Sequence, residues 1–120
     1  MSTVVNVTIN AINQTAFPDP APVSSPDTLL NFFLDYDSIA AGYTFKPVSA
    51  ISMVDPSTQF IGSWTMPNTL QCTLVDLKTE DDTYHYYVDV MPPPSPSDVV
   101  GTPRASVRIQ FDPAIKNNSA

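Results

Sequence analysis

The chain has 120 residues, a length typical of one domain with a single hydrophobic core. Hydrophobic residues make up 42% of the sequence and charged residues 14%, which argues against disorder, and no apolar run reaches the length of a membrane span. The formal net charge of −7 argues against a broad surface for nucleic acid or anionic lipid. We therefore expect one domain over residues 1–120, with neither nucleic acid nor membrane as a partner.

The residue types that interrupt the apolar segments favour strands and turns over helices. Eleven of the 12 acidic residues are Asp, a poor helix former and a common turn residue, and there are 13 prolines. Cys72 is the single cysteine, which excludes an internal disulfide and any site with several thiolate ligands. No metal-spacing or phosphate-binding motif occurs, so we expect no metal and no cofactor. The N-terminal residues lack the basic and long apolar stretches of a secretory signal, and we expect a cytoplasmic protein.

Apolar and polar residues alternate at the start of the chain. The alternation in Val5–Ala11 predicts a half-buried strand. The Pro-rich segment Phe17–Asp27 predicts an extended crossing over the surface. The dense apolar run Leu29–Tyr36 suits either a central strand or one short helix, and periodicity alone leaves both open.

The rest of the chain predicts further strands separated by turn residues. They are Tyr43–Met53 with an interruption at Pro47, Phe60–Met66, Leu70–Leu77, Thr83–Met91 and Ala105–Phe111. About seven short strands of this kind are typical of an antiparallel sandwich, so we expect an all-β, immunoglobulin-like β-sandwich. Cys72 alternates with polar neighbours in its strand and is expected to face the core.

If the last two predicted strands, Thr83–Met91 and Ala105–Phe111, pair antiparallel, their residue patterns restrict the possible registers. Their apolar residues should share one face and their polar residues the other. The register that is symmetric around the intervening loop sets three pairs opposite each other: Asp89 with Arg108, Tyr87 with Gln110, and His85 with Asp112. A slip of two residues keeps the same parity but changes the partners, so parity alone leaves the individual pairs open. His85 is the only histidine, and the tyrosines around it favour a packing role over a chemical one.

Three Asp-Pro bonds carry a specific chemical weakness: Asp19-Pro20, Asp55-Pro56 and Asp112-Pro113. The Asp carboxyl can attack its own main-chain carbonyl, and a protonated proline nitrogen is a good leaving group. A fold that holds these groups in place supplies part of the barrier through proximity, and a neighbouring carboxylate can instead activate a water molecule. The structural interpretation is simpler, because Asp-Pro is a common dipeptide where strands end and turns begin.

Two segments together resemble the bacterial DP-EP family. They are Met53–Phe60, with the sequence MVDPSTQF, and Phe111–Asn118, with the sequence FDPAIKNN. The opening Val4–Ile9 and the segment Tyr84–Val90 are also similar to it, so the resemblance spans nearly the whole chain. It implies a small β-sandwich that cleaves its own backbone as an aspartic-type endopeptidase, at the bond that matches Asp112-Pro113 in this chain. It also implies self-assembly and capture of the Asp carbonyl by a lysine amine, although no lysine of this chain matches a family position.

The leading hypothesis is therefore autoproteolysis at Asp112-Pro113, with the chain's own C-terminal segment as substrate. Asp112 is the reacting residue, and His85 is a candidate positioning group because of the predicted register. A water molecule activated by a nearby carboxylate is the favoured mechanism, and Asp89 and Asp55 are the candidates for that carboxylate. The alternative is a non-catalytic sandwich that serves as an assembly or binding module, in which Asp112-Pro113 only ends the last strand.

Overall fold

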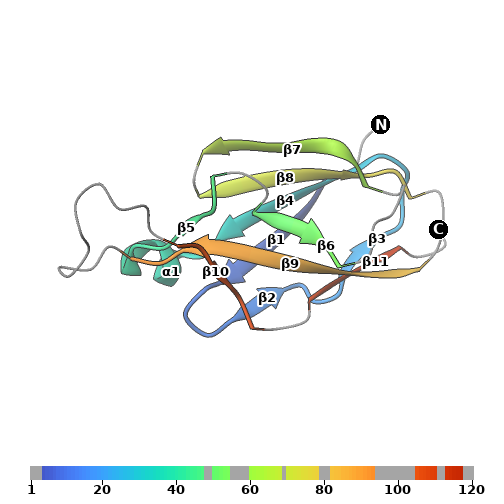
Figure 1. Cartoon of the computed structure of the whole chain (residues 1–120). Coiled ribbons are helices and arrows are strands. Elements are labelled where there is room, and N and C mark those ends of the chain that lie inside the picture. The colour runs from blue at the N-terminus through green and yellow to red at the C-terminus, as the bar shows by residue number, and fades with distance from the viewer. Residues whose placement is uncertain are drawn as a thin grey trace.

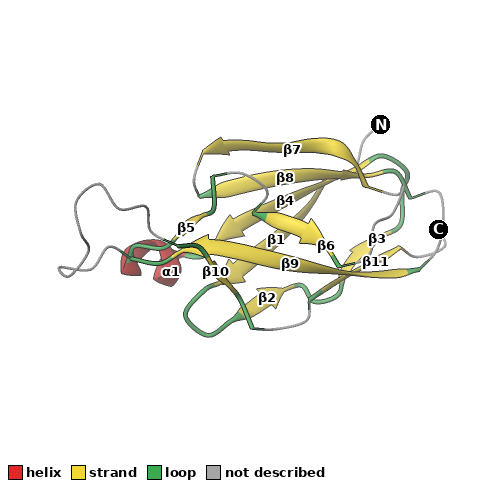
Figure 2. Ribbon diagram, viewed as in Figure 1, coloured by secondary structure: helices red, strands yellow, loops and turns green. Residues whose placement is uncertain are grey.

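The protein folds as two β-sheets packed around a shared hydrophobic core (Figure 1). The computed structural model describes residues 4–47, 50–54, 60–68, 70–78, 82–93, 105–110 and 113–117, with the backbone alone described for residues 61–68. Within these ranges the regular structure is nearly all strand, with one short helix at one end of the sandwich (Figure 2).

Short strands make up most of the chain and divide between the two sheets. In chain order the elements are β1 (Val4–Asn10), β2 (Thr15–Phe17), β3 (Ala21–Val23), β4 (Thr28–Leu34), α1 (Tyr36–Ala41), β5 (Thr44–Phe45), β6 (Ile51–Met53), β7 (Phe60–Asn68), β8 (Gln71–Asp76), β9 (Thr83–Met91), β10 (Val107–Arg108) and β11 (Ala114–Asn117). The first sheet has the strand order β2-β1-β4-β8-β7. The second sheet has the order β10-β9-β11-β3, and β5 and β6 also pair with β9.

The core consists of the inward-facing residues of both sheets. In β4 every second residue is fully or nearly fully buried, as the pleat of a strand with one face inward requires. Phe32 of the first sheet meets Tyr86 of the second edge to face, with ring centroids 5.3 Å apart. This geometry is a favoured one for aromatic rings, and it forms one of the contacts between the two sheets within the core.

The predicted all-β sandwich is confirmed, and most of its strands lie where the sequence predicts them. The strand predicted at Thr83–Met91 has the same bounds as β9. The run Leu29–Tyr36 is a strand as far as Leu34 and turns into helix α1 at Tyr36. The pairing differs from a purely antiparallel sandwich at two places, because β1 runs parallel to β4 and β3 runs parallel to β11.

The predicted surface crossing at Phe17–Asp27 is wrong in its middle part. Ala21 and Val23 are fully buried, and the short strand β3 that contains them pairs with β11. The sequence pattern misleads at this point because Pro22 lies between them and prolines are rare inside sheets. Pro22 faces outward and is exposed, and β3 is the last strand in the order of the second sheet, where a proline is tolerated.

Helix α1 begins where the apolar run of β4 ends. Asp35 caps it, since its Oδ1 accepts a hydrogen bond from the Ser38 backbone N–H at 2.9 Å. Its Oδ2 accepts a second hydrogen bond from Asn10 at 2.7 Å. The helix ends at Gly42, whose φ of 98° lies in the left-handed region that glycine adopts without strain.

The predicted last strand at Ala105–Phe111 is much shorter in the structure. Its described regular part is β10, which has two residues, and Phe111 lies outside the described residues. A separate strand, β11, follows and continues the sheet beside β9. The C-terminal segment thus forms an integral strand of the second sheet.

We expect the packing of β11 to contribute a large share of the stability. Ile115 is completely buried, so Ile115→Ala should lower the free energy of unfolding by about 2–5 kcal/mol. The neighbouring Lys116 is exposed, and Lys116→Ala should change the free energy by less than about 0.5 kcal/mol. Urea denaturation of both variants measures the difference. Equal effects would show that β11 does not pack on the core in solution.

Candidate functional site

The segment that follows the Asp112-Pro113 bond lies between two strands of the second sheet (Figure 1). Strand β11 pairs antiparallel with β9, where Ala114 lies opposite His85, and parallel with β3, where Ile115 lies opposite Ala21. Pro113 is buried, and Ala114 and Ile115 are 6% and 0% exposed. The backbone just after the Asp112-Pro113 bond is therefore held on both sides.

Two hydrogen bonds fix the backbone at the start of this segment. The Tyr86 backbone N–H donates to the Pro113 carbonyl oxygen at 3.1 Å. The Ala114 N–H donates to the Asp19 carboxylate Oδ1 at 3.0 Å. Asp19 thus contacts the backbone one residue after Asp112-Pro113, the bond that the sequence identifies as chemically weak.

Asp19 is a site residue that the sequence pattern alone missed as a candidate. It belongs to another of the three Asp-Pro dipeptides, Asp19-Pro20, but it is separated from Ala114 by 95 positions in the chain. Its placement depends on the parallel pairing of β3 with β11, which no alternation pattern predicts. Of the candidate carboxylates, Asp55 lies outside the described residues, as does the predicted reacting residue Asp112.

The predicted pairing of His85 with Asp112 is wrong. His85 lies opposite Ala114, two positions further along the chain, and its side chain is exposed. Arg108 does pair with Asp89. A continuous antiparallel ladder along β9 would then place residue 112 opposite His85, but Ala114 lies there, so the chain between Arg108 and Ala114 contains two additional residues. This local irregularity shifts every later partner by two, and His85 loses the role that the predicted register assigned to it.

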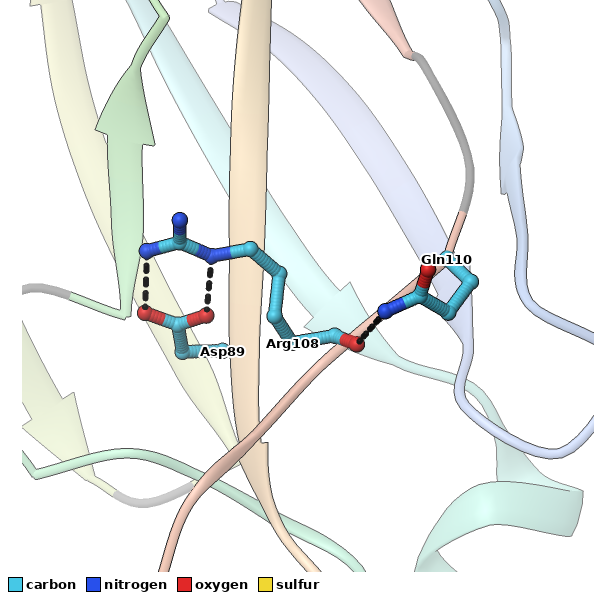
Figure 3. A network of polar contacts seen from close by, with 3 residues as sticks. All are labelled: Asp89, Arg108 and Gln110. Carbon is cyan, nitrogen blue, oxygen red and sulfur yellow. Dashed lines mark hydrogen bonds and ion pairs between the residues drawn. The ribbon is translucent and has the colours of Figure 1, made fainter.

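The predicted Asp89–Arg108 pair is confirmed (Figure 3). Arg108 Nε lies 3.0 Å from Asp89 Oδ1, and its terminal nitrogen lies 3.3 Å from Oδ2. The Arg108 guanidinium also lies over the Tyr87 ring, 4.1 Å from the ring centroid. The hydrogen bond from Arg108 to the Asp89 carboxylate raises the pKa of the arginine, which stays charged.

This pairing gives Asp89 a structural role. Arg108 binds both of its carboxylate oxygens. Asp89 also lies opposite Arg108 in the β9–β10 ladder, and Arg108 precedes the Asp112-Pro113 bond in the chain. The predicted pair of Tyr87 with Gln110 does not form, because the β10 ladder ends at Arg108. The Gln110 N–H instead donates to Gln14 Oε1 at 2.8 Å, which ties the chain after β10 to the turn between β1 and β2.

Two titratable side chains, Cys72 of the first sheet and Tyr86 of the second, are buried in the core. Cys72 is 1% exposed, and burial raises the pKa of its thiol to about 12, so it does not form a reactive thiolate at neutral pH. Tyr86 is also 1% exposed, and burial, followed by the charge of Asp19, raises the pKa of its hydroxyl. Both side chains belong to the core, as predicted for Cys72.

The described residues contain neither a pocket nor a cluster of three or more His, Cys, Asp and Glu side chains suited to a metal ion. In the same part of the chain, no helix has the length and apolar character needed to cross a membrane. No protein-family model matches the chain, and no curated protein matches it. The site must therefore be interpreted from its own geometry.

We expect the Asp89–Arg108 pair to show a modest, salt-sensitive coupling. Because the Arg108 side chain is 49% exposed, a double-mutant cycle with Asp89→Asn and Arg108→Gln should give about 0.5–1 kcal/mol of coupling at low salt. Molar salt should reduce this coupling. Arg108→Lys should lose at least half of it, because lysine lacks both the two-pronged contact and the flat stacking surface. Urea denaturation of the four proteins measures the coupling, and none at low salt would contradict the observed geometry.

Proposed function

We propose that the chain cleaves its own Asp112-Pro113 bond and retains the released C-terminal segment as strand β11. The observation that carries this proposal is the hydrogen bond from the Ala114 N–H, one residue after the bond, to the Asp19 carboxylate, which is 3.0 Å long. Because one residue spans at most about 3.6 Å, Asp19 Oδ1 lies within roughly 7 Å of the Pro113 nitrogen. A carboxylate at that distance can hold a water molecule against the bond.

In the proposed reaction the two carboxyl groups have different roles. Ionised Asp19 takes a proton from a water molecule, whose oxygen bonds to the main-chain carbonyl carbon of Asp112. Protonated Asp112 donates its side-chain proton to the Pro113 nitrogen as the carbon–nitrogen bond breaks. The products are a new carboxyl group on Asp112 and a free amine on Pro113, with one water molecule consumed. The reaction requires one carboxyl group to be charged and the other to be neutral.

A second route leads to the same products without Asp19 as a base. The Asp112 carboxyl oxygen bonds to its own main-chain carbonyl carbon, the carboxyl proton passes to the proline nitrogen as the carbon–nitrogen bond breaks, and water opens the resulting cyclic anhydride. This route needs only that the backbone be held still, as the hydrogen bonds of Pro113 and Ala114 do. The dependence of cleavage on Asp19 separates the two routes.

Retention follows from the packing of the segment after the bond. Ile115 and Asn117 are 0% and 2% exposed, and β11 pairs with a strand on each side. Breaking one peptide bond removes none of these contacts. The peptide therefore stays bound until the second sheet opens.

Mass spectrometry under denaturing conditions tests the proposal. Protein incubated at mildly acidic to neutral pH should yield a species that lacks Pro113–Ala120, and Asp112→Ala should abolish it. Asp19→Asn should slow its appearance by at least about 100-fold on the water route. Asn keeps an oxygen that can accept the Ala114 N–H, so this variant should keep the fold. Asp37→Asn, at an exposed site in the first turn of α1, is the matched control and should cleave at the parent rate.

Three outcomes are informative. Cleavage that needs Asp112 and is unaffected by Asp19→Asn would select the anhydride route. Cleavage that persists in Asp112→Ala would overturn the proposal, because another acid would then be responsible. A single uncut species in the parent protein after long incubation would leave the non-catalytic assembly or binding module as the better hypothesis.

A further inference from the structure

A carboxylic acid is completely buried where the first sheet meets the C-terminal strand. Asp76, the last residue of β8, is 0% exposed. Its Oδ1 accepts hydrogen bonds from the Lys78 backbone N–H at 2.9 Å and from Asn117 Nδ2 at 3.3 Å. Within the described part of the chain, its Oδ2 is buried and has no hydrogen-bond partner.

The contact with Asn117 links the two sheets. Asp76 belongs to the first sheet, and Asn117 is the last residue of β11 in the second sheet. Asn117 is 2% exposed, and its backbone N–H donates to the Asp82 carbonyl oxygen at 2.8 Å. The end of β11 is therefore held by a buried side-chain contact as well as by backbone pairing.

The surroundings of Asp76 disfavour a negative charge. Its neighbours in the ladders on either side are Thr28 of β4 and Phe60 of β7, which carry no charge. Burial raises the pKa of the Asp76 carboxyl, and the hydrogen bonds from Lys78 and Asn117 and the charge of Lys78 only partly oppose this. Other titratable residues among or next to the elements at this end are Asp27, Asp82, Tyr84 and Lys116; Glu80 and Asp81 lie outside the described residues.

We propose that Asp76 is a proton-controlled latch on β11: its neutral form holds the strand in place, and loss of its proton loosens the strand. The proton remains on the otherwise unbonded side of the carboxyl group, so no charge is buried in the closed state. When β11 moves away, water reaches Asp76 and the carboxylate forms readily. The latch is independent of peptide cleavage, and in a cleaved chain it would govern release of the C-terminal peptide.

The direction of the pH effect follows from linkage. Because the pKa of Asp76 is raised in the closed state, its contribution to holding β11 is fully present below its ordinary value of about 3.8. That contribution declines as the pH rises through the pKa of the closed state. The latch therefore holds most firmly in acid, which is opposite to the behaviour of an aspartate in a salt bridge.

Hydrogen exchange of individual amides tests this proposal in the uncleavable Asp112→Ala background. The Asn117 amide reports on β11, and amides of β4 report on opening of the whole domain. Between pH 4 and pH 7 the protection factor of Asn117 relative to β4 should fall at least tenfold. The Asp76→Asn variant keeps an oxygen that accepts both hydrogen bonds and cannot ionise. In this variant the protection factor of Asn117 relative to β4 should change less than threefold over the same pH range. Asp37→Asn should follow the background protein.

A matching pH profile in the background protein and in Asp76→Asn would overturn the latch. If Asp76→Asn does not fold, the carboxyl carbon of Asp76 can be titrated directly by NMR in the background protein. The latch requires that this carbon titrate above the exposed Asp37. Titration at or below Asp37 would overturn it. Neither measurement depends on cleavage, so failure of the latch and failure of autoproteolysis are separate results.

Discussion

The insertion of β11 between β9 and β3 is the constraint on which the rest of the structure depends. It places a buried residue, Ile115, in the core and pairs the last described strand with β3, one of the earliest. It also brings the Asp19 side chain to the backbone after Asp112-Pro113. The same insertion that completes the sheet thus creates the environment of the chemically weak bond.

Three aspartates near the second sheet have different environments, each suited to a different role. Asp89 is bound on both oxygens by Arg108 and stabilises the β9–β10 pair. Asp76 is completely buried, and this burial raises the pKa of its carboxyl and so favours the neutral form, although the hydrogen bonds from Lys78 and Asn117 oppose it in part. Asp19 is exposed and bound to the Ala114 N–H, which suits a carboxylate that handles a water molecule. The proposed cleavage and retention of the C-terminal segment rest on this arrangement of acids.

The alternation of apolar and polar residues predicts where strands lie and which residues face the core. It does not predict features that depend on pairing between strands far apart in the chain. The bounds of β9 follow from the alternation of apolar and polar residues, and the Asp89–Arg108 pair follows from that alternation together with a register symmetric around the intervening loop. The place of His85 does not, because two additional residues before β11 shift the register. Asp19 could not be identified from the sequence. Its position depends on the parallel pairing of β3 with β11, two strands far apart in the chain, and no local sequence pattern predicts such a pairing. Asp76 had a usable signal: it shares the parity of Cys72, and a strand that buries Cys72 buries Asp76 as well.

Native mass spectrometry of the incubated protein tests the central claim most directly, because it weighs the folded particle with its non-covalent contacts intact. We expect the native particle to gain the mass of one water molecule while keeping all 120 residues, and the same sample to separate into two pieces once denatured. A native particle that has lost the C-terminal eight residues would contradict retention by β11. A particle of unchanged mass under both conditions would contradict self-cleavage.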